Sequence, residues 1–69
     1  MKELREKAII NLEATLRLLK HEFAKGLDDI NDTYFLSCGR AWGYCTLGLI
    51  TDDETLSWIE KFADACEGR

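Results

Sequence analysis

The sequence TYFLSCGRAWGYCTLGLI, residues 33–50, is apolar on every side when it is read as a helix, and Arg40 is its one charged residue. Three stripes of aliphatic, aromatic or small side chains run along it. A helix that is apolar all round is normally buried by its neighbours. We therefore expect a largely buried central helix, held between amphipathic helices before and after it.

Two glycines, Gly39 and Gly43, lie within this stretch at a spacing of four residues. Such a spacing lets another segment approach a helix closely. Each glycine also costs about 1 kcal/mol relative to alanine in a helix interior. We expect close packing to compensate for that cost, with a bulky side chain such as Phe23 or Trp58 lying against the glycines.

The segment before the central stretch has apolar residues at alternating spacings of three and four, which predicts an amphipathic helix over residues 2–25. These seam residues are Ile9, Leu12, Leu16, Leu19 and Phe23. Thr15 marks where one side of the seam turns polar. Lys25 and Gly26 are typical of a helix C-terminus.

The segment after the central stretch begins with Thr51-Asp52-Asp53-Glu54, a capping box that predicts a helix over residues 52–66. Its inward residues are expected to be Leu56, Ile59, Phe62, Ala63 and Cys66, with Trp58 at the edge. The central helix itself is expected over residues 31–47, capped by either Asp29 or Asp32. The prediction is an all-α, three-helix bundle forming a single helical domain, residues 1–69.

The composition fits a small folded protein of the cytoplasm. With 46% hydrophobic and 32% charged residues, disorder is not expected. The N-terminus, MKELREKAII, is charged where a secretory segment would be apolar. Arg40 and the glycines argue against a membrane span. Without a CxxC spacing, Cys38, Cys45 and Cys66 are expected to be reduced and buried.

A second, weaker apolar line lies opposite the seam of the first helix. It consists of Ile10, Ala14 and Leu18. Single exposed apolar residues are common on protein surfaces. A chain this short also gains stability by dimerisation. Chance exposure and a dimer face both remain open for this line.

The sequence offers no pattern of catalytic residues, metal ligands or cofactor-binding glycines. His21 is the one histidine, on the polar side of the first helix. No serine or cysteine has a recognisable base near it in sequence, and no glycine loop follows a phosphate-binding order. We expect a protein that is not an enzyme and that binds no metal or cofactor.

The charge is divided unevenly along the chain. Residues 1–26 carry six basic and four acidic residues, a net of +2, and residues 27–69 carry three and nine, a net of −6, which together give −4. Acidic residues at the start of the last helix would repel phosphates, so a small DNA-binding regulator is the least favoured alternative. Some acids cap helices, but the surplus suggests a surface for a basic partner. The candidate acidic face consists of Asp28, Asp29, Asp32, Asp52, Asp53, Glu54, Glu60 and Asp64.

The ending GYCTLGLITDDETLSWIEKF resembles that of short helical proteins of bacteria, phages and mobile elements. In those proteins a glycine-containing helix runs into an LGLIT-type turn, an acidic capping box and a last helix with an aromatic residue. The matching positions here are Gly43, residues 47–51, residues 52–54 and Trp58. The resemblance implies a phage or mobile-element protein. By analogy of class, small acidic proteins of that origin include anti-CRISPR proteins.

These observations favour a small protein-interaction module. Its most specific form is an anti-CRISPR-type inhibitor whose acidic face covers the basic, nucleic-acid-binding surface of a host protein. The alternative is a homo-oligomeric or accessory helical module that associates through Ile10 and Leu18, with Trp58 as a further contact.

Overall fold

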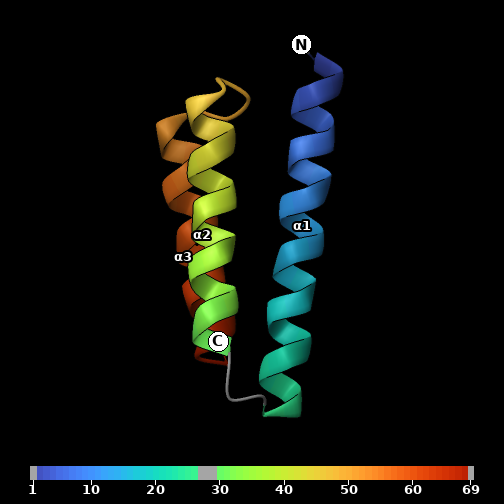
Figure 1. The fold of residues 1–69 in the computed structure, drawn as a ribbon, viewed down its shortest axis with the longest axis vertical. Coiled ribbons are helices and arrows are strands. Elements are labelled where there is room, and N and C mark those ends of the chain that lie inside the picture. The colour runs from blue at the N-terminus through green and yellow to red at the C-terminus, as the bar shows by residue number, and fades with distance from the viewer. Residues whose placement is uncertain (1, 27–29, 69) are drawn as a thin grey trace.

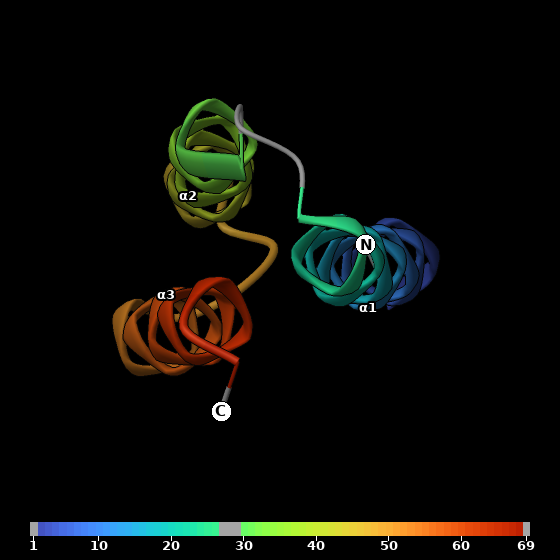
Figure 2. The ribbon, with the colours of Figure 1, turned by 90° about the horizontal axis from the view of Figure 1, so that it is seen from below.

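The computed structural model describes residues 2–26 and 30–68, which form three helices: α1 (Lys2–Lys25), α2 (Ile30–Thr46) and α3 (Asp52–Cys66). The helices run down, up and down, so that α1 and α3 are parallel and α2 is antiparallel to both (Figure 1). Each helix packs against the other two, in a triangle when seen along the axis (Figure 2). The molecule measures 38 × 18 × 18 Å. The predicted all-α, three-helix bundle is confirmed.

The boundaries of α3 follow from local chemistry. The Thr51 hydroxyl accepts a hydrogen bond from the Glu54 backbone N–H at 3.1 Å, and the Glu54 carboxylate accepts one from the Thr51 N–H at 2.9 Å. The predicted capping box is confirmed. Asp32 lies in the first turn of α2 and is therefore not its cap, while Asp29 lies outside the described residues. Gly48 takes a positive φ of 77° in the turn between α2 and α3, a conformation that favours glycine.

The core is narrow because small residues bring the helices together. Its buried hydrophobic residues are Ala8, Leu12, Leu19, Ala41, Leu49, Ile50, Phe62 and Ala65. Each helix also buries one hydroxyl, from Thr15, Ser37 or Thr55. Each of these hydroxyls donates to the backbone carbonyl four residues earlier, at 2.7–2.8 Å. These three buried hydroxyls are therefore satisfied within their own helices.

Four positions on α1 and α3 differ from the expected inward faces. Leu56 and Phe23 are exposed, whereas Thr55 and Thr15 are buried. The physical reason is register, since Thr55 is seven residues before Phe62 and shares its side of α3, about 100° away from Leu56. The Phe23 ring instead covers Gly68, where an added Cβ would lie 2.7 Å from it.

The expectation that the central helix is largely buried is wrong for one of its sides. Only Ser37 and Ala41 of α2 are buried. Two neighbouring helices cover one side of α2, and a bundle of three helices provides nothing for the other. Phe35 and Leu36, which belong to two of the apolar stripes of this stretch, consequently face outward.

Residues 2–26 and 30–68 include no helix with both the length and the apolar character needed to cross a membrane.

Candidate interaction surface

The exposed Asp32 lies at the N-terminal end of the outer face of α2, and the rest of this face is formed by uncharged residues that the fold leaves uncovered. They are Phe35, Leu36, Gly39, Trp42 and Gly43, with Leu47 just beyond the end of the helix. The four large side chains among them are between 46% and 71% exposed. The adjacent Thr46 hydroxyl donates to the Trp42 carbonyl at 2.9 Å, so it does not make this face more polar.

Arg40 borders the outer face of α2 but extends toward α1. Its Nη1 donates to the Thr15 hydroxyl at 3.1 Å. The Thr15 hydroxyl donates in turn to the Asn11 carbonyl at 2.8 Å. The one charged residue of the central stretch therefore joins two helices, and its charge lies beside the apolar surface rather than on it.

Gly39 and Gly43 have open space beside them within the part of the chain that the structure describes. A Cβ added at either position would meet no atom within 4 Å. The expectation that Phe23 or Trp58 packs against them is wrong, because both glycines point away from the bundle. The close approach of the helices is made instead by Ser37 and Ala41 on the opposite side of α2.

The predicted line on α1 is also exposed. Ile10, Ala14 and Leu18 face solvent, with Ile10 61% exposed. The line is one residue wide, because Glu13 and Arg17 adjoin it in sequence and are themselves exposed. Association through this line stays a prediction.

The acidic residues fall into separate places rather than on one continuous face. Asp53, Glu60 and Asp64 share the outer side of α3, and we call them the α3 acidic line. Asp52 accepts a hydrogen bond from the Cys45 thiol at 3.0 Å at the start of α3. Asp32 lies in the first turn of the antiparallel helix α2, and therefore at the other end of the bundle (Figure 1). Asp28 and Asp29 lie outside the described residues.

Glu54, the last member of the predicted acidic face, is held by Arg5. The guanidinium donates two hydrogen bonds to the carboxylate, at 2.9 and 2.6 Å, and a third to the Leu49 carbonyl at 3.0 Å. The two hydrogen bonds from Arg5 and the one from the Thr51 N–H lower the pKa of Glu54 from 4.5 to about 2. The Glu54 carboxylate is thus a structural group that joins α1 to α3.

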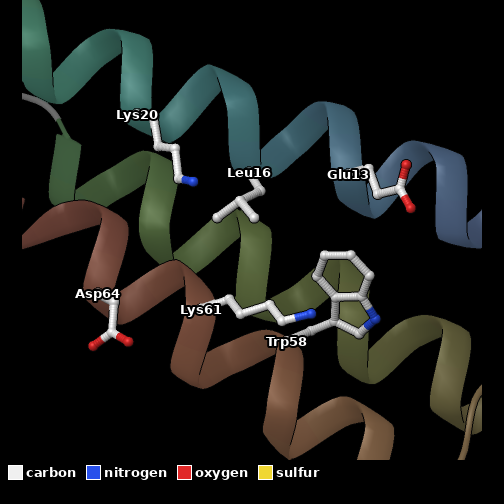
Figure 3. A pocket seen from close by; sticks show the side chains of 6 residues that line it. All are labelled: Glu13, Leu16, Lys20, Trp58, Lys61 and Asp64. Carbon is white, nitrogen blue, oxygen red and sulfur yellow. The ribbon is translucent and has the colours of Figure 1, made fainter. Parts of the chain in front are cut away.

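A surface groove of about 430 Å³ lies between α1 and α3. Its lining residues are Glu13, Leu16, Lys20, Trp58, Lys61 and Asp64 (Figure 3). The Lys61 ammonium lies 4.5 Å from the centre of the Trp58 ring, and the same ring is 6.0 Å from that of Phe62. Trp58 is therefore both a core residue and a wall of the groove. Charges of both signs surround it, which gives the groove no selectivity for a ligand of one charge.

The cysteines are free, and they are half-buried rather than buried as expected. The hydrogen bond to Asp52 raises the pKa of Cys45, and burial raises that of Cys66. Both shifts favour the thiol over the more reactive thiolate. His21 is exposed. Within the described residues, no three histidine, cysteine, aspartate or glutamate side chains are grouped so as to hold a metal ion.

Comparison with known proteins gives no match to this chain, either with protein-family models, with curated proteins or with solved structures.

Two of the interactions described above were not predicted from the sequence. The Arg5–Glu54 pair had a usable signal, because the first and third helices of such a bundle are parallel and their first turns lie at the same end. A basic residue in the first turns of α1 is thus a natural partner for the capping glutamate of α3. The Arg40–Thr15 bond had no such signal, since it depends on which side of α2 faces inward.

Proposed function

We propose that this protein is a small, non-enzymatic protein-interaction module that binds another protein chain through the outer face of α2. The observation that carries the proposal is the set of large, exposed, uncharged side chains on one arc of this helix. Single exposed apolar residues are ordinary, but a contiguous apolar patch marks an interaction site.

The sequence of α2 supports this reading. A complex that buried the exposed side chains of Phe35, Leu36 and Trp42 would be stabilised by about 25 cal/mol per Å² of apolar surface removed from water. Aromatic residues are also enriched at the centres of protein interfaces, and charged residues are depleted there. The outer face of α2 has both properties.

Site-specific photo-crosslinking tests the proposal. We expect p-benzoylphenylalanine at position 36, in place of the exposed Leu36, to form crosslinks to a protein chain in bacterial cells that express the full protein. The same group in place of Ser57, which is exposed on α3, is the control. Position 36 giving no more crosslinked protein than position 57 would contradict the proposal.

The α3 acidic line supports a second candidate, a partner-binding surface for a basic host protein. Within this line Glu60 and Asp64 are like charges four residues apart, an arrangement that mildly destabilises a helix. Its most specific form is an anti-CRISPR-type inhibitor of phage or mobile-element origin that acts in the bacterial cytoplasm. In that form, carboxylates occupy a nucleic-acid-binding groove in place of phosphates.

Charge reversal tests the second candidate. The D53K/E60K variant is expected to lose binding to a CRISPR effector complex in a pull-down at low salt, while circular dichroism shows the same helical content. Asp32→Lys, at the other end of the bundle, is the matched control for a reversed charge. Equal retention of the double variant and the wild type would remove this candidate.

A further inference from the structure

We propose that the outer face of α2 is occupied by a second copy of this chain, in an antiparallel helix pair centred on Gly39. The inference rests on the proposed function, for which it names the partner. It uses a different surface from the Ile10–Leu18 line of α1.

Neither the backbone conformation nor the packing of the described monomer requires glycine at positions 39 and 43. Neither has a positive φ, so the backbone does not require glycine at either position. Among residues 2–26 and 30–68, no atom beyond the adjoining helix backbone lies within 4 Å of a Cβ added at either position, so the packing of these residues does not require glycine either. Glycine destabilises a helix interior. A second helix that lies close to the backbone would account for both positions.

The outer face of α2 is complementary to the same face of a second copy. In an antiparallel pair centred on Gly39, residues at equal distances before and after position 39 lie opposite each other. Phe35 of each copy then faces Gly43 of the second copy, and Leu36 faces Trp42. Phe35, Leu36 and Trp42 thereby each meet either a glycine or an apolar partner, while Leu47 lies opposite Asn31 at the end of the pair. A two-fold symmetric interface needs this reciprocal arrangement.

The antiparallel pair keeps like charges apart. In the same alignment Asp32 faces Thr46 of the second copy, and Arg40 faces Cys38. No carboxylate is brought opposite a carboxylate, and no cation opposite a cation. The Ile10–Leu18 line of α1 is narrower and adjoins exposed charged residues, which makes it the weaker candidate for self-association.

The outer face of α2 offers an apolar area large enough for a second copy to cover. The four large side chains of the outer face leave on the order of 500 Å² exposed per copy, since such side chains bury about 150–250 Å² each when fully covered. Complete coverage of this area on both copies would bury about 1,000 Å², the size of a weak biological interface. A chain of 69 residues with three alanines among its eight buried hydrophobic residues benefits from such added burial.

The test is the effect of G39A/G43A on association and on monomer stability, measured on the full chain. For the wild type we expect sedimentation equilibrium to fit a monomer–dimer equilibrium. For G39A/G43A we expect the dissociation constant to rise by about tenfold or more, because two methyl groups separate the helices and loosen their contacts. At concentrations where both proteins are monomeric, we expect Tm to rise by about 5 °C for each alanine. A higher Tm together with weaker association is the result that helix propensity alone cannot produce.

Two further variants make the test specific. F35E is expected to be monomeric with unchanged helical content. I10D/L18D, on the α1 line, is expected to dimerise like the wild type. A wild type that is monomeric at all concentrations would overturn the inference, as would an unchanged dissociation constant in G39A/G43A, or a monomeric I10D/L18D.

The crosslinking experiment separates this inference from the proposed function. If position 36 crosslinks to a different protein while the purified chain is monomeric, the second copy is overturned and the interaction module stands. If position 36 gives no specific crosslink to any chain, and the purified chain is also monomeric, both are overturned.

Discussion

The carboxylate of Glu54 serves two structural purposes at once. One oxygen accepts the Thr51 N–H and so closes the capping box of α3. Both oxygens accept hydrogen bonds from the Arg5 guanidinium of α1. The cap was predictable because Thr51 and Glu54 are three residues apart, and their spacing alone determines the geometry. Arg5 is 49 positions away, and its role depends on how the helices are arranged.

The lowered pKa of Glu54 predicts how stability depends on pH. Its value in the folded protein, about 2, lies below the ordinary 4.5. The ionised carboxylate therefore favours the folded state above about pH 4.5, and this contribution is lost as the pH falls toward 2. We expect the free energy of unfolding in urea to fall between pH 5 and pH 2.

The E54Q variant isolates this effect from the titration of other carboxylates. Glutamine at this position can still accept the Thr51 N–H but carries no charge to pair with Arg5. We expect E54Q to be less stable than the wild type at pH 6 and to differ little from it at pH 2. A constant difference between the two proteins across this range would refute the assignment.

At the scale of the helix, the pattern of apolar residues predicted α1 and α3 better than it predicted their inward residues. The periodic seam of α1 includes Leu12 and Leu19, which are buried, and Phe23, which is not. On α3, hydrophobicity favoured Leu56 over Thr55, although Thr55 is the residue that faces the core. A hydroxyl that bonds to its own helix is compatible with burial, and sequence patterns treat it as polar.

The same substitution at two leucines tests the observed register. We expect Leu12→Ala to cost about 2–5 kcal/mol of folding free energy, because Leu12 is fully buried and its loss leaves a cavity. We expect Leu56→Ala to cost less than about 0.5 kcal/mol, because Leu56 is largely exposed. Chemical denaturation measures both. Comparable losses at the two positions would show that Leu56 contacts the core.

The orientation of α2 could not be predicted from its sequence. A helix with a polar side shows which side faces solvent, but the stretch at residues 33–50 has apolar or small residues all round it. The fully buried residues of α2 are Ser37 and Ala41, which hydrophobicity would rank below Phe35, Leu36 and Trp42. Tyr34 and Tyr44 pack against the core beside them. For that reason the sequence predicted a central helix and not the surface that we propose as its interaction site.

At the scale of the whole molecule, the fold was predictable because its determinants are local. Periodic seams, a glycine at the end of α1 and a capping box at the start of α3 define three helices, and short connections make neighbouring helices antiparallel. The distribution of function on the surface was not predictable in the same way. Among the described members of the predicted acidic face, Asp32 and Asp53 lie at opposite ends of the bundle (Figure 1).

The pair between Arg5 and Glu54 has a consequence for the order in which the chain assembles. The two residues are 49 positions apart, whereas α2 and α3 are joined by the short turn at residues 47–51. Closing a long loop costs more chain entropy than closing a short one, and α1 and α2 are also joined by a short connection, residues 26–29. Contacts between neighbouring helices are therefore favoured to form before α1 meets α3. On that route the Arg5–Glu54 contact belongs to the last step of folding and the first step of unfolding, so its loss would speed unfolding more than it slows folding.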